Sequence, residues 1–209
     1  MSLVKPEMMM RCFDVILNKL VKYPLSNSEF DTTLKYGIFV TFKKFNHGEY
    51  DLRGCIGYLS PISISDIDRY AISSAFKDYR FDPISIEEVS SLRCTVSLLH
   101  SFTKQKSCFD WIVGKHGIII EFEEDGEYYR ATYLPEVAKE QDWDVKTTLR
   151  HLIQKSGYRQ KPDAELFNRI ELTTYETQLA SLTFDEYVKM TQERNRDIIE
   201  FCKNKGLQL

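Results

Sequence analysis

The sequence predicts an α+β fold, in which a mainly antiparallel sheet is flanked by helices within a compact, two-lobed single domain. An Asp-Gly pair at residues 125–126 separates two alternating segments, which is typical of an antiparallel hairpin. Helical patterns occur at irregular intervals, so a repeating βαβ sheet is not expected. No repeat, low-complexity tract or Pro/Gly-rich linker divides the chain. We therefore expect one domain over residues 1–209, ordered from about residue 7 to residue 205, with room for a smaller second lobe.

The first third of the chain predicts one helix and two strands. Residues 7–22 carry apolar side chains at helical spacing and stop before Pro24. Residues 36–42 (YGIFVTF) are β-branched and aromatic, and residues 49–59 alternate, so both predict strands. A bulge at Gly54 or Gly57 would shift the register of the second strand. A regular strand would place two sets of side chains on opposite faces: Tyr50, Leu52, Ile56 and Tyr58 on one, and Asp51, Arg53 and Cys55 on the other.

A helix capped by Asp66 or Asp68 should follow and run to about Arg80, and residues 92–102 predict the next strand. The predicted hairpin then pairs residues 117–122 with residues 128–134 through a type I′ turn. In that register the numbers of paired residues sum to 251, so Glu121 lies opposite Arg130. The core face of the hairpin would carry Ile118, Ile120 and Phe122 with Tyr129, Ala131 and Tyr133.

The last third predicts three helices and a strand. Pro135 begins a helix, and Asp144 caps a second helix that ends at Gly157. Residues 168–178 predict a strand. Residues 183–186 (TFDE) form a capping-box pattern that opens a closing helix, which we expect to end at Gly206.

Composition limits the classes of function. Hydrophobic residues make up 43% of the chain, which is enough for a sizeable core, and no segment approaches the roughly 20 apolar residues of a membrane span. The start of the chain lacks the apolar run of a secretory signal, so we expect a cytoplasmic and/or nuclear location. The five cysteines are odd in number and scattered, which favours reduced thiols over a disulfide framework: Cys12, Cys55, Cys94, Cys108 and Cys202.

Charge and motifs exclude several activities. A net charge of −3 argues against a nucleic-acid-binding protein, and the short runs at residues 43–44 and 104–106 are interpreted as solvated loop charges. There is no C-x-x-C pair, and Cys94, Cys108 and His116 lack zinc-site spacing. Phosphate-loop, dinucleotide and serine-hydrolase fingerprints are also missing, so no metal or cofactor is expected.

Residues 53–57 (RGCIG) form the best candidate functional centre. The thiolate is the reactive form of cysteine, and a guanidinium nearby favours it; Arg53 lies two positions from Cys55. Gly54 and Gly57 would let other groups approach the backbone closely. His116 is a candidate base if the strands are adjacent. The alternative interpretation is structural, since cysteine is often a small buried residue and a histidine before a strand is often an ordinary polar residue.

Further candidates lie on either side of the hairpin. Lys77, Asp78 and Arg80 either form a solvated helix end or recognise an anion beside Arg53. Tyr133 and Glu136 are similarly ambiguous, because an acidic residue in a first helical turn is ordinary electrostatics. The candidate ligand-binding set is therefore Arg53, Gly54, Gly57, Lys77, Asp78, Arg80, Arg130, Tyr133 and Glu136.

Several ordered segments stand out when they are taken together: residues 52–57 (LRGCIG), 74–81 (SAFKDYRF), 94–99 (CTVSLL), 110–111 (DW), 116–122 (HGIIIEF), 130–138 (RATYLPEVA) with Glu140-Gln141, and 157–158 (GY). Together they resemble the AMMECR family over most of the chain. The resemblance implies an α+β domain with an antiparallel sheet and a smaller second lobe. It also implies prokaryotic association with Memo-type and radical-SAM proteins, but no established reaction.

The sequence departs from the family pattern at four positions, where Tyr58 replaces Thr, Tyr79 replaces Ser, Asp82 replaces Pro and Ser156 replaces Gly. The two tyrosines are expected to narrow or reshape a pocket near RGCIG. Three functions follow as hypotheses: a binding or adaptor module for a protein partner or a small anionic ligand, a thiol-dependent enzyme that uses Cys55, and a nucleic-acid-associated regulatory protein. The first is the preferred interpretation.

Overall fold

Six strands form one sheet in the order β2-β1-β3-β6-β4-β5 in the computed structural model, which describes residues 2–25 and 27–194. Neighbouring pairs β1–β2, β4–β5 and β4–β6 are antiparallel, which confirms the predicted fold class. The strands are β1 (Lys35–Asn46), β2 (Glu49–Ser63), β3 (Leu92–Lys104), β4 (Gly117–Glu124), β5 (Glu127–Tyr133) and β6 (Glu171–Thr183). The predicted order up to residue 205, the helix end at Gly206 and Cys202 lie outside the described residues.

The helices are α1 (Pro6–Val21), α2 (Ile67–Phe76), α3 (Pro135–Glu140), α4 (Val145–Lys155), α5 (Ala164–Arg169) and α6 (Phe184–Arg194). Two 3₁₀ helices, η1 (Ile64–Asp66) and η2 (Ile86–Ser91), precede α2 and β3. The sequence reasoning did not predict α5 or η2. Within the described part of the chain, no helix is long and apolar enough to cross a membrane.

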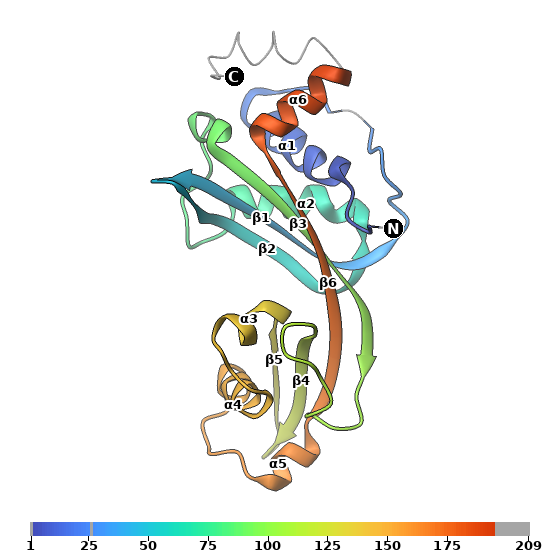
Figure 1. Ribbon diagram of the computed structural model, residues 1–209, viewed down its shortest axis with the longest axis vertical. Helices are drawn as coiled ribbons and strands as arrows, with labels where there is room; N and C mark the ends of the chain where they lie inside the picture. The colour runs from blue at the N-terminus through green and yellow to red at the C-terminus, as the bar shows by residue number, and fades with distance from the viewer. Residues whose placement is uncertain (1, 26, 195–209) are drawn as a thin grey trace. The chain divides into compact units, whose positions relative to one another are not determined.

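Contacts divide the chain into two compact units. The first comprises Met1–Leu98 with the segment from Gln178 onward, and the second comprises Leu99–Thr177, so β3 and β6 contribute residues to both. In the first unit α1, α2 and α6 lie beside the strands (Figure 1). The buried ring of Phe13, on α1, belongs to the core that they form with the sheet. That ring contacts Phe42 of β1 and both Phe184 and Tyr187 of α6. The amphipathic pattern of residues 7–22 therefore forms the core of this unit.

The second unit is built on the predicted hairpin. Asp125 and Gly126 have φ of 52° and 78°, as a type I′ turn requires. The register pairs Glu121 with Arg130, and the two side chains form an ion pair with a distance of 3.2 Å. Ile118, Ile120 and Phe122 are buried against α4, while Tyr129, Ala131 and Tyr133 pack on the same core. Both the predicted register and the predicted core face are confirmed.

Helix starts were also predicted correctly where the signal is local. The Asp144 carboxylate accepts a hydrogen bond from the Thr147 N–H (2.6 Å), and α3 begins at Pro135. At the start of α6 the Glu186 N–H donates to Thr183 Oγ1, while the Thr183 N–H donates to the Glu186 carboxylate, which completes the capping box.

Three local predictions were wrong. The helix predicted to reach Arg80 ends at Phe76; Asp66 occupies its N-cap position without a capping side-chain hydrogen bond, and Asp68 lies in the first turn. Asp66 already has helical φ and ψ as the end of η1, and the Asp68 carboxylate instead binds Arg11 (2.6 Å). The strand predicted from residue 168 starts at Glu171, because residues 164–169 form α5 under an Asp163 cap.

The face assignment on β2 was wrong at two positions. Leu52 and Tyr58 are 39% and 50% exposed, although they were expected on an apolar face with Ile56. For Leu52 the reason is a register shift: Phe42 pairs with Gly54 but Lys43 pairs with Leu52, so Arg53 is left unpaired as a bulge. Tyr58 lies beyond this bulge, next to a second irregularity between Tyr36 and Ile38. A bulge reverses the facing of the residues on one side of it relative to those on the other, and the adjacent glycine had suggested such a bulge.

Candidate functional site

Helix α2 approaches the edge strand β2 at Gly54 without an intervening side chain. A Cβ atom added at Gly54 would lie well under 3.0 Å from the carbonyl oxygen of Ser74, so this position requires glycine for close approach. The Ser74 hydroxyl accepts a hydrogen bond from the Ile56 N–H (2.7 Å) and donates one to the carbonyl of Val40. Since Ile56 pairs with Val40 in the register, the hydroxyl is inserted into the β1–β2 ladder.

The segment after α2 binds the backbone of Cys55. Asp78 is 3% exposed, and its carboxylate accepts a hydrogen bond from the Cys55 N–H (2.9 Å). Arg80 donates to both oxygens of that carboxylate (2.9 and 2.6 Å) and to the Cys55 carbonyl (3.2 Å). The hydrogen bond from Arg80 lowers the pKa of Asp78 well below its usual value. Asp78 and Arg80 therefore hold the edge strand, whereas Lys77 is the exposed C-cap of α2 and takes no part in these contacts.

The Arg53 guanidinium binds the carboxylate of Glu88, which lies in η2. Its Nε and one Nη donate to the two oxygens of Glu88, both at 3.0 Å, and its other Nη donates to the Asp82 carbonyl (2.7 Å). Lys44 also donates to Glu88 (3.0 Å). Burial raises the pKa of Glu88, but hydrogen bonds from Arg53, the Ser85 N–H and Lys44 outweigh it and lower that pKa to about 2. The guanidinium was predicted to activate the thiol or bind an anion, yet it is saturated by internal partners.

The Cys55 sulfur contacts a side chain of the neighbouring strand β1. Thr41 pairs with Cys55 across β1–β2, and the Thr41 hydroxyl lies 3.1 Å from Sγ and donates to it. Cys55 is partly exposed, and among the described residues its sulfur forms a hydrogen bond with Thr41 alone, while Arg80 interacts with Cys55 electrostatically. Arg53 and Cys55 are thus neighbours in sequence with separate partners. The arrangement supplies a hydrogen-bond donor to the sulfur and no base.

Four other predicted site residues lie in the second unit: His116, Arg130, Tyr133 and Glu136. Arg130 pairs with Glu121, and the ring of Tyr133 lies beneath the ammonium of Lys155 at 4.5 Å. Glu136 stands in the first turn of α3. The Nδ1 atom of His116 accepts a hydrogen bond from the Ile112 N–H (3.2 Å), which is a loop contact. The residues predicted from sequence therefore divide between the two units.

Lys77 lines a pocket of about 350 Å³ between α1 and α2, with Lys19 and Asp68 among the other lining residues. No residue of the RGCIG segment lines this pocket, and neither does Tyr58 or Tyr79, whose side chains are exposed. In the part of the chain that the structure describes, no group of three or more His, Cys, Asp or Glu side chains comes together as a metal site.

Three residues of the site were missed by sequence reasoning: Thr41, Ser74 and Glu88. Ser74 and Thr41 are ordinary hydroxyl residues in a helix and a strand, and nothing local marks them. Glu88 had a signal, because Ser85-Ile86-Glu87-Glu88 is a capping-box pattern, and the box forms at the start of η2. The pattern predicts the turn that contains Glu88. It does not predict the partner of Glu88, because Arg53 lies 35 residues away in the sequence.

Together these observations define an α+β protein with an antiparallel sheet whose edge strand carries an RGCIG segment, bound there by Ser74, Asp78 and Glu88. The AMMECR1 family model matches residues 9–180. The chain belongs to the AMMECR1 family.

Relatives of the chain occur in eukaryotes and archaea. An uncharacterised protein of Arabidopsis thaliana is 40% identical over 87% of this chain and 86% of its own length. An uncharacterised protein of Schizosaccharomyces pombe is 34% identical over 88% of this chain and 95% of its own. The crystal structure of an uncharacterised protein from Pyrococcus horikoshii has a TM-score of 0.64 at 27% identity, covering 83% of this chain and 87% of that one.

Proposed function

We propose that the chain is a binding module without turnover, and that a protein partner contacts the turn formed by Asp78, Tyr79 and Arg80 beside Cys55. The observation that carries the proposal is the contrast within this turn. Tyr79 is 95% exposed, while its two neighbours are fixed by hydrogen bonds to the backbone of β2. An aromatic side chain is therefore presented to solvent on a backbone that is already ordered.

Such a presentation favours recognition. Tyrosine offers a large amphipathic contact with few rotatable bonds, and tyrosines are frequent among the residues that contribute most to binding energy at interfaces. A backbone that is ordered before binding loses less conformational entropy in the complex. A single exposed apolar residue is ordinary on a protein surface. The fixed neighbours are what distinguish Tyr79 from such a residue.

The contacts of the candidate catalytic groups give catalysis less support. A cysteine nucleophile needs a base within hydrogen-bond reach or another group that activates it. The Cys55 sulfur accepts a hydrogen bond from the Thr41 hydroxyl, which is not a base, and the Arg53 guanidinium is bound to Glu88. His116 belongs to the second unit and has its own loop contact.

The family resemblance suggests a Memo-type protein as the partner, and Arg80, whose side chain is 44% exposed, would meet an acidic group on it. A small anionic ligand at the same turn is the alternative. The free thiols of Cys12, Cys94 and Cys108 support the proposed cytoplasmic and/or nuclear location. The net charge of −3 gives the nucleic-acid hypothesis no support.

Calorimetric titration with a Memo-type protein from the same genome tests the proposal. Replacement Tyr79→Ala should weaken binding at least about tenfold, as loss of a central aromatic contact would. Tyr128→Ala is the matched control, because Tyr128 is 64% exposed but lies in the second unit. Cys55→Ser should bind like the unmodified protein. Absence of binding, equal affinity of the Tyr79 variant, or loss of binding with Cys55→Ser would each contradict the proposal.

A second candidate is thiol chemistry at Cys55, favoured by the Thr41 hydroxyl that donates to its sulfur. The test is the rate of alkylation by iodoacetamide at neutral pH, followed by peptide mass spectrometry. An activated thiol should react faster than free cysteine, and Thr41→Val should slow it. Cys12 and Cys94 are fully buried and serve as internal controls that should stay unmodified. A Cys55 rate at or below that of free cysteine would remove this candidate.

A further inference from the structure

The chain is acidic overall, but one segment of the second unit is purely basic. Residues 145–162 contain no Asp or Glu and carry Lys146, Arg150, Lys155, Arg159 and Lys161. The flanking carboxylates are used locally. Asp144 caps α4, and the Asp163 carboxylate accepts a hydrogen bond from the Leu166 N–H (2.8 Å) at the start of α5. The positive charge of this segment is therefore concentrated within a protein whose net charge is −3.

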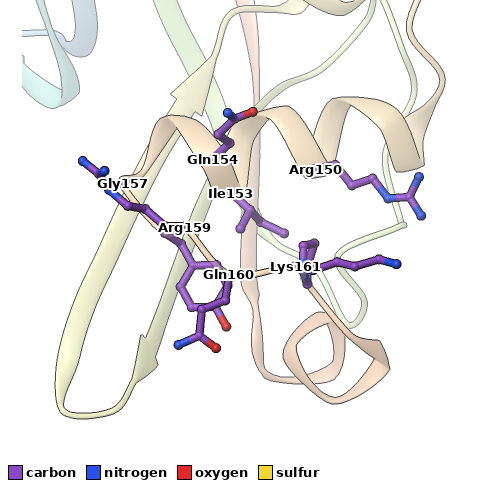
Figure 2. Close-up of a pocket in the computed structure, with 9 residues that line it drawn as sticks. Arg150, Ile153, Gln154, Gly157, Arg159, Gln160 and Lys161 are labelled. Atoms are coloured by element: carbon purple, nitrogen blue, oxygen red, sulfur yellow. The ribbon is translucent and has the colours of Figure 1, made fainter.

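The basic segment encloses a pocket of about 800 Å³ between the second half of α4 and the loop that follows it. We call it the cationic pocket and define it by Arg150, Gln154, Arg159, Gln160 and Lys161 over a floor of Ile153 and Tyr158. No acidic residue lines it. Figure 2 shows Arg150 and Lys161 extending toward the same side, while Arg159 extends the opposite way. The pocket thus presents positive charge on both sides and amide groups between.

Within the described residues the three cations have no close side-chain partner, and Arg150 interacts with the Asp144 carboxylate only electrostatically. Across the described ranges, Arg150, Arg159 and Lys161 form no ion pair and no side-chain hydrogen bond, whereas Arg53, Arg80 and Arg130 are all paired. Cations in the last turn of a helix complement its dipole, but Arg159 and Lys161 lie beyond the end of α4. A polyanion long enough to reach from Arg150 and Lys161 to Arg159 would be stabilised by all three cations.

The pocket is held in shape by its buried floor. Ile153 and Tyr158 belong to the core of the second unit, where the Tyr158 ring packs edge-on against Phe122 and Tyr129. Gly157 follows α4 with a φ of +98°, a left-handed conformation that favours glycine and reverses the chain. The loop then returns beside α4. This reversal brings Arg159 and Lys161 into one pocket with Arg150.

The chemistry of the lining selects the ligand class. Guanidinium, ammonium and amide groups are the donors that bind phosphate oxygens, and arginine binds them with two parallel hydrogen bonds. Tyr158 is only 7% exposed, so the aromatic residue that lines the pocket offers a nucleobase little area on which to stack. We propose that the cationic pocket binds a small anion with two or more phosphate groups, and that it recognises the phosphates alone.

Calorimetry of the full chain at low ionic strength tests this with inorganic tripolyphosphate as the probe. Tripolyphosphate should bind at least about tenfold more tightly than orthophosphate, since only a polyanion reaches cations on both sides. The double variant Arg159→Gln with Lys161→Gln should weaken it at least about tenfold, as loss of charge-assisted hydrogen bonds implies. Both side chains are exposed, so circular dichroism should show an unchanged fold.

The matched control is Lys104→Gln with Lys106→Gln, which removes the same charge elsewhere and should leave affinity within about twofold. Equal weakening by the control would reveal diffuse attraction and overturn the proposal, as would absence of tripolyphosphate binding. ATP should bind no more tightly than tripolyphosphate; tenfold tighter binding would refute recognition of phosphates alone. If a short DNA duplex binds and tripolyphosphate cannot displace it, the pocket is a nucleic-acid surface and the proposal is overturned. Tyr79→Ala should leave tripolyphosphate binding unchanged, which separates this test from that of the proposed function.

Discussion

Replacement of Gly54 by alanine tests the contact on which the RGCIG segment depends. The added Cβ would lie well under 3.0 Å from the backbone carbonyl of Ser74, and a backbone atom cannot rotate out of the way. Helix α2 would therefore have to move by about 1 Å from β2 in a close-packed interior. That shift would withdraw the Ser74 hydroxyl from the Ile56 N–H and the Val40 carbonyl.

The cost can be worked from these two effects. Overpacking of an interior position costs about 1–3 kcal/mol, and the hydrogen bonds lost with Ser74 add about 1 kcal/mol. Loss of glycine freedom in the unfolded chain offsets up to about 1 kcal/mol, because φ at Gly54 is outside the positive range. We expect the free energy of unfolding to fall by about 2–3 kcal/mol. For a chain of this size that corresponds to a decrease in Tm of roughly 4–12 °C.

Urea denaturation followed by circular dichroism measures the loss, and amide hydrogen exchange at Ile56 reports the contact directly. Gly126→Ala is the control: nothing lies within 4 Å of an added Cβ there, so its cost arises only from the positive φ and should be about 1 kcal/mol. The reasoning would be refuted if Gly54→Ala unfolded at the same urea concentration as the unmodified protein. Full protection of the Ile56 amide in that variant would refute it equally.

Two further predictions concern the carboxylates. Glu88→Gln should lower the free energy of unfolding by about 2 kcal/mol at pH 7, because Arg53 loses a partly buried partner. The folded pKa of Glu88, about 2, lies below its ordinary value of 4.5, so its contribution is complete above pH 4.5 and is lost as pH falls toward 2. The difference between the two proteins in urea denaturation should therefore shrink between pH 5 and pH 3, and a constant difference would contradict the assignment. Asp144→Ala should cost about 1 kcal/mol through loss of the α4 cap, whereas Asp144→Asn should cost much less, and equal Tm values for all three proteins would disprove that cap.

Much of the architecture could be predicted because its signals are local. The Asp-Gly turn sets the register of β4 with β5, so the pairing of Glu121 with Arg130 follows from counting residues. The caps at Asp144 and Thr183 bond to groups three residues away. Local patterns failed where a distant group competed for the same atoms. Asp68 binds Arg11 instead of capping α2, and the bulge at Arg53 changed the facing of Leu52 relative to Ile56.

The sequence by itself determined the fold class and the hairpin, because turn geometry and alternation depend on adjacent residues, and it singled out residues 53–57 as a candidate site. Only the tertiary structure decided what those residues touch. Arg53 meets Glu88 across 35 positions, Cys55 meets Asp78 across 23, and the basic residues after α4 enclose a pocket because Gly157 reverses the chain. Contacts between distant segments depend on how elements pack, and no local pattern encodes that packing.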